Sequence, residues 1–496
     1  MSKRISRSLA LITLLTLVIA THPAKNSATV PAPQRATVAS GATRNTAIVA
    51  ATTEVLKETS EIRELAILKP VKSGAQSRTQ IERMLIKNLN EQMTTAEMHA
   101  TEVSLRKLGL APADFEYQPF IIKLLTEQVA GYYDPKVQEF HLADWLELEG
   151  QKPVMAHELT HALQDQHFNL RRFEKWPHGE SDAELAAHAL IEGDATLAMA
   201  LYMAKNPLVA LAFSRSLTTG VATEQFNQAP RAMRESLMFP YMQGMEWTTQ
   251  LYKRGGWALV SKAFTRLPLS SEQILHSEKY FNYERPIKVV LPDVANLLNA
   301  TKEPAISHKL SAALPEQSIG TLGVPRAPVA KGSSPPPLPE SSWPTAYRPL
   351  PTDLWRRIDS DVNGEWSYYL ILDQFLNSPA ESKRAAAGWA GDRYALYEGP
   401  KAQVFLAQLA LWDSDNDARE FFDAYAKRTE LRYPGARQLG SADSITRNSK
   451  VETRNSLSWQ TTEGRVIIEL RGLRVLILEG VPEGVDSDAL VKTLSQ

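Results

Sequence analysis

The chain has no cysteine among its 496 residues. This absence excludes disulfide bonds, a thiolate ligand for zinc and a membrane anchor attached through a lipid-modified cysteine. It also excludes a latency switch in which the thiol of a pro-segment caps a metal. The stability of the folded protein must therefore come from the size of its core and from any bound metal rather than from cross-links.

A strong charge of either sign is also absent, because 55 basic residues balance 56 acidic residues and leave a net charge of -1. A chain without a basic surplus has no electrostatic footprint for nucleic acid or for an anionic membrane surface, so we expect neither as a partner. The composition, 43% hydrophobic and 22% charged, is typical of globular proteins. The length suggests two or three domains.

Long apolar runs are scarce, and the run at the N-terminus, residues 9–20, has 12 residues, which is too short to span a bilayer comfortably. It follows a positively charged start, and Val18 and Ala20 suit a cleavage site. We predict that residues 1–20 are a signal peptide. The mature protein is then periplasmic or secreted, with no stable membrane span after cleavage. An uncleaved signal anchor is the alternative.

The most informative motif is an HExxH sequence that begins at His157 and ends at His161. Pro153 suits a first helical turn, and no Gly or Pro interrupts residues 154–170, so we expect the motif on a helix. Two histidines four positions apart then point the same way and can bind one Zn²⁺, while Glu158 can take a proton from a metal-bound water. The alternative is that these are ordinary residues of a partly buried helix.

A catalytic zinc site needs three protein ligands and one open position. A second strongly helical segment downstream carries Glu192, Glu184 and His188 near one face. We assign Glu192 as the third ligand, because Gly193 has no side chain to crowd a facing helix and Asp194 could hydrogen-bond a ligand imidazole. Glu184 remains a competing ligand, and His188 is expected to be a packed or supporting residue.

These motifs resemble the active site of the thermolysin-like gluzincins, zinc metallopeptidases defined by HExxH and a glutamate on the next helix. The sequences HELTHALQDQ at residues 157–166 and EGDA at residues 192–195 are also similar to a group of poorly characterised bacterial exported proteins. The resemblance covers about half the chain and implies zinc-dependent peptide hydrolysis in a zincin-like fold. The 30 residues between His161 and Glu192 exceed the spacing in thermolysin itself, which leaves the third ligand open.

Two segments around the motifs carry further expectations. Residues 127–142 predict a β-hairpin around an Asp-Pro turn. The resemblance implies that one arm is the edge to which an extended peptide substrate adds, whereas a hairpin that only covers the core is the alternative. The resemblance also implies a late His or Tyr that stabilises the oxyanion. His276 fits that position as a catalytic residue, with Tyr280 as its substitute.

The chain as a whole predicts an α+β protein, with a mainly helical zincin-like catalytic domain, a small edge sheet and a separate C-terminal α+β domain. Pro-rich and low-periodicity segments set the boundaries. We expect a flexible linker at 21–53, a metallopeptidase domain with a helical lead-in at 54–295, a Pro-rich linker at 296–350 and a domain of unknown role at 351–496. Whether residues 54–110 form a removable pro-segment stays open.

The sequence therefore predicts an exported zinc metallopeptidase that cleaves a peptide or protein substrate. His157, His161 and Glu192 would hold one Zn²⁺ per chain, and Glu158 would act as general base. One alternative is a zinc hydrolase of non-peptide amides or esters. Another is a catalytically idle binding or assembly protein of the cell envelope. The natural substrate and the oligomeric state are not determined by the sequence.

Overall fold

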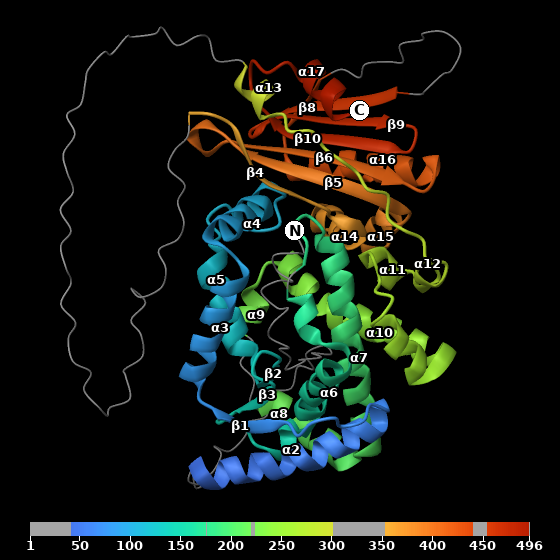
Figure 1. Ribbon diagram of the computed structural model, residues 1–496. Helices are drawn as coiled ribbons and strands as arrows, with labels where there is room; N and C mark the ends of the chain where they lie inside the picture. Colours follow the sequence, from blue (N-terminus) through green and yellow to red (C-terminus); the bar gives the residue numbers. More distant parts are fainter. Residues whose placement is uncertain (1–40, 175, 220–223, 301–352, 440–453, 496) are drawn as a thin grey trace, which may run out of the picture.

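The computed structural model describes residues 41–174, 176–219, 224–300, 353–439 and 454–495. The predicted signal peptide, residues 21–40 of the first linker and almost all of the Pro-rich linker lie outside these residues. The expected α+β class is confirmed, because a helical N-terminal part is followed by a C-terminal part built on an antiparallel sheet of seven strands (Figure 1).

The N-terminal part is mainly helical. Its helices are α2 (Gly41–Arg63), α3 (Arg78–Gln92), α4 (Thr95–Lys107), α5 (Tyr117–Gln128), α6 (Lys152–Phe168), α7 (Ser181–Lys205), α8 (Pro207–Thr219), α9 (Glu224–Gln228), α10 (Arg231–Ala263), α11 (Ser271–Leu275) and α12 (Ser277–Phe281), with short 3-10 helices η1 (Glu149–Gln151) and η2 (Leu170–Phe173). α6 and α7 cover the two segments that the sequence predicts to be helical around the motifs.

A three-stranded sheet lies beside these helices, in the order β1 (Lys72–Gln76), β3 (Glu139–Ala143), β2 (Gly131–Asp134). β2 and β3 form the predicted antiparallel hairpin. β1 pairs in parallel with β3 and lies inside the predicted helical lead-in, which is therefore not helical at these five residues. β1 contains no β-branched or aromatic residue, and its extended conformation depends on its partner strand rather than on local propensity.

α2 corrects the predicted N-terminal linker. Residues 41–53, expected to be flexible, form the first half of this helix. α2 runs along the base of the helical part (Figure 1), and its apolar residues share a buried cluster with residues of α6. Small alanines and threonines separate its few large apolar side chains, which hides the helical period in the sequence. The buried members of α2 and α6 in this cluster are Ile48, Ala51, Val55, Leu56, Met155, Ala156, Leu159 and Leu163.

α7 is the central helix of the N-terminal part and packs against both α6 and α10. A Cβ at Gly193 would lie 2.2 Å from the carbonyl carbon of Gly244, and a Cβ at Gly244 would lie 2.2 Å from the oxygen of Ala189. The backbones of α7 and α10 are therefore in direct contact. The helix that packs closely against Gly193 is therefore α10, and not α6, which carries the histidines.

The C-terminal part is a sheet covered by helices on both faces. Its sheet order is β4-β5-β6-β10-β9-β8-β7, and every pairing is antiparallel. The elements are α13 (Ala295–Asn299), β4 (Arg356–Asp361), α14 (Gly364–Leu376), α15 (Pro379–Ala386), β5 (Trp389–Glu398), η4 (Pro400–Ala402), β6 (Val404–Trp412), α16 (Asp415–Arg432), β7 (Arg437–Leu439), β8 (Arg454–Thr461), β9 (Gly464–Arg471), β10 (Arg474–Val481) and α17 (Ser487–Leu494). α13 occupies the first residues of the predicted Pro-rich linker.

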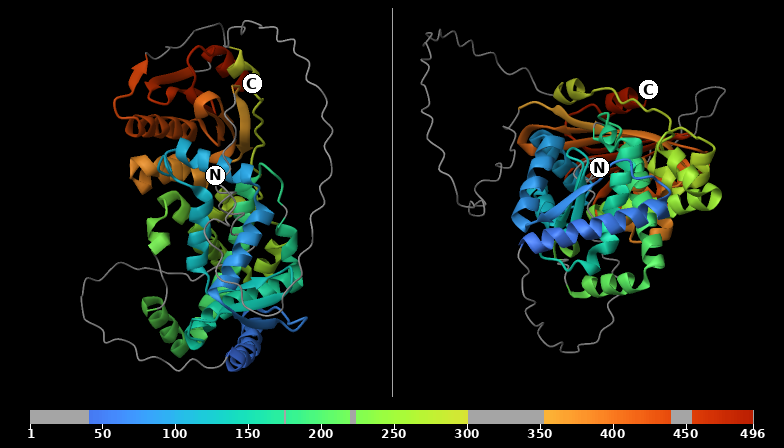
Figure 2. Two further views of the ribbon diagram at one scale, coloured as in Figure 1. Left: turned by 90° about the vertical axis from the view of Figure 1, so that its left-hand side faces the viewer. Right: turned by 60° about the horizontal axis from the view of Figure 1, so that its bottom comes forward.

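Alternating side chains of the strands divide the core between the two faces of the sheet. Tyr394 and Leu396 of β5 pack with α14 and α16, whereas Ala395 and Tyr397 pack with α13 and α17. Figure 2 shows α16 and α17 on opposite sides of the strands. The face that carries α14 is turned toward the helical N-terminal part.

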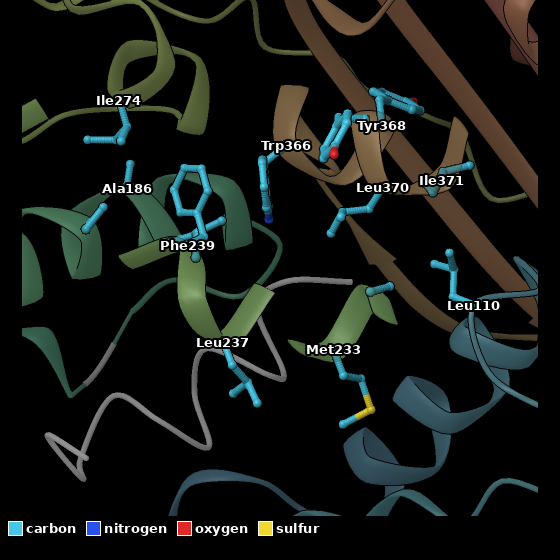
Figure 3. Packing of buried hydrophobic residues seen from close by; sticks show 14 of the residues in the cluster. Leu110, Ala186, Met233, Leu237, Phe239, Ile274, Trp366, Tyr368, Leu370 and Ile371 are labelled. Atoms are coloured by element: carbon cyan, nitrogen blue, oxygen red, sulfur yellow. The ribbon is translucent and has the colours of Figure 1, made fainter. Parts of the chain in front are cut away.

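The two parts share one hydrophobic cluster across their junction. Trp366 of α14 packs on Phe239 of α10, with 4.7 Å between the ring centroids, and Ala186 of α7 and Ile274 of α11 belong to the same cluster (Figure 3). The C-terminal α+β part therefore packs directly on the helix that carries Glu192.

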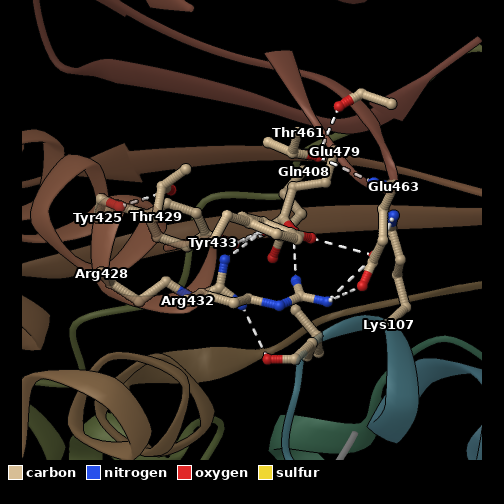
Figure 4. Close-up of polar contacts among 12 residues, drawn as sticks. Lys107, Gln408, Tyr425, Arg428, Thr429, Arg432, Tyr433, Thr461, Glu463 and Glu479 are labelled. Carbon is tan, nitrogen blue, oxygen red and sulfur yellow. Dashed lines mark hydrogen bonds and ion pairs between the residues drawn. The ribbon is translucent and has the colours of Figure 1, made fainter. Parts of the chain in front are cut away.

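A buried charge network also crosses the junction (Figure 4). Glu479 of β10 accepts hydrogen bonds from Arg428 Nη1 at 2.7 Å and from Arg432 Nη1 at 2.6 Å, and Lys107 of α4 pairs with Glu463 at 2.9 Å. Because the side chains of Glu479 and Arg428 are both fully buried, each needs the other as a counter-charge.

Within the described residues, no single helix is both long and apolar enough to cross a membrane. One pair of helices, residues 181–205 with residues 207–216, reaches the required length and composition only jointly and is bent by 115° at its break.

Candidate metal centre

α6 presents the HExxH motif from a well-defined helix. Pro153 lies in its first turn, where the missing amide hydrogen costs nothing. Asn169 ends the helix in the left-handed conformation, with φ of 55°, and its N–H donates to the carbonyl of Asp165. His157 and His161 are buried on this helix, so their rings are directed into the protein and not into solvent.

Three side chains from two helices converge on one point. Nε2 of His157 lies 3.0 Å from Nε2 of His161 and 3.1 Å from Oε2 of Glu192, and Nε2 of His161 lies 3.4 Å from the same oxygen. All three residues are buried. Two imidazole nitrogens and one carboxylate oxygen in this arrangement form a set that could hold a metal ion.

The structure places Glu192 beside the histidines. Glu184 and His188 lie on the same helix, about two turns and one turn nearer its start respectively, and are also buried. Among the described residues, the ligand atoms that gather within 4.8 Å of one another here belong to His157, His161 and Glu192. Burial lowers the pKa of His188 to about 4, so this imidazole is neutral near pH 7.

Electrostatics keep the carboxylate of Glu192 ionised. Burial alone would raise its pKa, but the charge of His161 and hydrogen bonds from both histidines lower the pKa to about 2. Burial lowers the pKa of His157. Burial acts in the same direction on His161, yet the charge of Glu192 and its hydrogen bond outweigh it, and the pKa of His161 is raised. The centre is therefore built around a fixed negative charge.

Hydrogen bonds behind the rings orient His161. Its Nδ1 lies 2.8 Å from Oε1 of Gln164, and Nε2 of Gln164 donates to Oδ2 of Asp194 at 2.9 Å. We expected Asp194 to contact a ligand imidazole directly, but the structure shows that Gln164 lies between them. Oδ1 of Asp194 accepts a further hydrogen bond from Arg63, which is 131 positions away in the sequence.

The hairpin is bound to the motif helix at two points. The backbone N–H of Tyr133 in β2 donates to Oε2 of Glu158 at 2.9 Å, and the hydroxyl of Tyr133 donates to Asp165 at 3.0 Å. Glu158 also lies close enough for its charge to act on His161. The fully buried carboxylate of Glu158 is thus held between the candidate metal centre and the edge strand of the small sheet.

His276 and Tyr280 are not brought to this centre. Nε2 of His276 lies 2.9 Å from Oε1 of Glu365 in α14, at the junction with the C-terminal part. The buried Tyr280 donates its hydroxyl to the carbonyl of Arg266 at 2.8 Å and packs on Trp247. The oxyanion role expected for His276, or for Tyr280 in its place, therefore finds no support in their positions.

Several residues around the centre were missed by sequence reasoning. Gln164 follows His161 by three positions, so helical spacing alone could have indicated it. Tyr241 of α10 is buried, and its ring centroid lies 6.0 Å from that of His157. No local signal in the sequence connects Tyr241, Tyr133 or Arg63 with the motif, because each lies on a different helix or strand from α6.

The fold and the centre together define a mixed α+β protein with a buried two-histidine, one-carboxylate cluster. A family described as a domain of unknown function (DUF8575) matches residues 352–490, which is the C-terminal part from β4 into α17. No curated protein and no solved structure matches the chain. The family match lies outside α6 and α7 and therefore does not bear on the chemistry of the centre.

Proposed function

We propose that this protein is an exported zinc-dependent metallopeptidase, with His157, His161 and Glu192 as metal ligands and Glu158 as general base. The convergence of the three ligand atoms at 3.0, 3.1 and 3.4 Å carries the proposal. Export is inferred from the N-terminal sequence, whose signal-like features lie outside the described residues.

The donor set suits zinc in both chemistry and size. Zn²⁺ binds imidazole nitrogen and carboxylate oxygen at about 2.0–2.1 Å in tetrahedral geometry, which sets neighbouring ligand atoms about 3.3–3.4 Å apart. The observed separations approach this value without any rearrangement of α6 and α7. When bound, zinc would polarise a scissile carbonyl and make a water molecule acidic enough to attack it near neutral pH.

Glu158 supplies the proton transfer in this proposal. A carboxylate next to the first histidine can take a proton from the attacking water and pass it to the leaving amine. The N–H of Tyr133 holds one carboxylate oxygen of Glu158 at 2.9 Å, so the side chain has little freedom to turn away. Glu158 is therefore oriented before a substrate binds.

The position of β2 supports a peptide as substrate. β2 is the outer strand of its sheet, paired with β3 on one side. The N–H of Tyr133 points away from β3 toward Glu158, which places the other edge of β2 beside the motif. An extended peptide bound along this side of β2 would pass next to the general base. The N–H of Tyr133 would not be among its partners, because Glu158 already accepts its hydrogen bond.

The test is a comparison of wild type with Glu158→Gln for zinc content and peptide hydrolysis, with the exposed Glu147→Gln as control. We expect about one zinc per chain in all three proteins, because the ligand residues remain. Hydrolysis of a peptide library should fall by about 100- to 10,000-fold only in Glu158→Gln.

Other outcomes select the alternatives. A wild-type protein that binds zinc but cleaves nothing would favour the idle binding protein. Turnover restricted to small amides or esters would favour the non-peptide hydrolase. Absence of stoichiometric zinc from the wild-type protein would contradict the metal site itself.

A further inference from the structure

We infer that Arg63, at the end of α2, is a positioning residue for His161 and acts through Asp194 and Gln164. This makes the N-terminal helix part of the metal centre. The inference rests on the proposed metal site, but it concerns how a ligand is held and does not depend on which bond the enzyme cleaves.

The first link fixes the protonation of the ring. Nδ1 of His161 lies 2.8 Å from Oε1 of Gln164, and an amide oxygen can only accept a hydrogen bond. Nδ1 must therefore carry a proton. In the neutral form that a metal ligand must adopt, the lone pair is then on Nε2, which faces Nε2 of His157 and Oε2 of Glu192.

The second link fixes the amide of Gln164. Its Nε2 donates to the carbonyl of Ile191 at 3.0 Å and to Oδ2 of Asp194 at 2.9 Å. Both partners are acceptors, so the nitrogen must face α7 and Oε1 must face His161. If the amide turned over, the oxygen of Gln164 would face two acceptors and its nitrogen would face the ring.

The third link is a buried ion pair. Nε of Arg63 lies 2.5 Å from Oδ1 of Asp194, and both side chains are 0% exposed. Asp194 needs a counter-charge at this depth, because an unpaired charge is costly to bury. Arg63 holds one carboxylate oxygen of Asp194, and the other oxygen is thereby kept facing Gln164.

Arg63 is itself held in place from α10. Its guanidinium lies 4.4 Å from the ring centroid of Trp257, and both terminal nitrogens lie 3.2 Å from Oγ of Ser261. The chain of contacts thus runs from α10 through α2 and α7 to the motif helix α6. Apolar residues of α2 also pack behind α6, so this helix supports the centre by packing as well as by hydrogen bonds.

The functional consequence concerns the N-terminal segment. If α2 supplies Arg63 to the support of His161, then loss of residues 41–63 weakens the centre. These residues are therefore not a pro-segment whose removal activates the enzyme.

The test measures zinc affinity in the full chain by competition with a chelator, for wild type, Arg63→Met, Arg63→Lys and Lys57→Met. Lys57 is an exposed charge on the same helix and serves as the matched control. We expect Arg63→Met to bind zinc about 10- to 100-fold more weakly, as is usual when an outer partner of a metal ligand is lost. Lys57→Met should match wild type, and Arg63→Lys should recover part of the loss because it keeps the charge.

A double-mutant cycle with Gln164→Leu separates positioning from general destabilisation. If Arg63 acts through Gln164, Arg63→Met should cost little further zinc affinity in the Gln164→Leu background. Additive losses would overturn the inference, as would an Arg63→Met protein that folds and keeps wild-type affinity.

If Arg63→Met does not fold, the Co²⁺ absorption spectrum of the folded Arg63→Lys protein decides. A spectrum that differs from that of Co²⁺-loaded wild type supports positioning, and an unchanged spectrum contradicts it. Wild type that binds no zinc refutes the metal site, whereas zinc binding without hydrolysis refutes only the proposed enzyme.

Discussion

The backbone N–H of Ser181 donates a hydrogen bond to Oδ1 of Asp361 at 3.0 Å, although the two residues are 180 positions apart. The hydroxyl of Ser181 donates to the other oxygen of the same carboxylate. Ser181 begins α7, and Asp361 ends β4 of the C-terminal part. A carboxylate at a helix start satisfies free amides and interacts favourably with the helix dipole. The C-terminal part thus caps the helix that carries Glu192.

We predict that Asp361→Ala lowers the free energy of unfolding by about 1–2 kcal/mol, the usual cost of losing a helix cap. α7 should fray at its first turn, because the N–H and the hydroxyl of Ser181 both lose their acceptor. Thermal unfolding of Asp361→Ala and of the control Asp353→Ala, an exposed residue just before β4, measures this. Equal melting temperatures for the two variants would contradict the capping role.

A second prediction concerns the third ligand. Glu192→Ala should release zinc, because it removes one of the three converging atoms. Glu184→Ala and His188→Ala should keep about one zinc per chain, since neither side chain belongs to that set. Metal analysis after dialysis measures the outcome. A zinc-free Glu184→Ala protein beside a zinc-loaded Glu192→Ala protein would reassign the ligand.

The parts of this structure that could be predicted are those with a local pattern. The motif helix follows from Pro153 and an uninterrupted helical segment, and the hairpin follows from the Asp134-Pro135 turn. In the C-terminal part, Gly472, which has a positive φ, lies in the turn between β9 and β10. In each case a few neighbouring residues determine the conformation.

The parts that could not be predicted depend on distant partners. β1 is a strand because β3 lies beside it, and Arg63 approaches the centre because α2 packs behind α6. His276 illustrates the same limit. The resemblance suggested an oxyanion donor at its position in the sequence, whereas its imidazole is paired with Glu365 of a different part of the chain. Spacing along the sequence does not specify which residues a histidine between two short helices contacts in the folded protein.

A third prediction follows from the buried Asp182. Burial raises its pKa to about 8, and the charges of Asp392 and Glu365 act in the same direction, against hydrogen bonds from Ser271. A folded pKa above the unfolded value of 3.8 means that the folded state binds the proton more tightly. The contribution of Asp182 to stability is therefore full below about pH 4 and falls as the pH rises toward 8.

The variant Asp182→Asn removes this titration and can still accept the hydrogen bond that Ser271 N–H donates at 3.0 Å. We expect its melting temperature to fall less than that of wild type between pH 5 and pH 8, an interval that lies within the two pKa values. Parallel pH profiles for the two proteins would show that Asp182 does not titrate in this range.

The last prediction concerns Glu479 in the network of Figure 4. Burial would raise the pKa of Glu479, but the charges of Arg428, Arg432 and Lys107 outweigh it and lower the pKa to about 2. A folded pKa below the unfolded value of 4.5 means that this stabilisation is present above pH 4.5 and is lost as the pH falls toward 2.

Glu479→Gln imitates the protonated form at every pH and leaves the buried Arg428 without its full counter-charge. At pH 7 we expect it to cost about 3–5 kcal/mol of unfolding free energy, the usual effect of breaking a buried ion pair from one side. Glu463→Gln is the matched control, because Glu463 joins the same network but its side chain is 42% exposed, and it should cost less. Denaturant unfolding from pH 7 down to pH 2.5 tests both points. The difference between wild type and Glu479→Gln should shrink below pH 4.5, and a difference that stays constant would show that folding does not lower the pKa of Glu479.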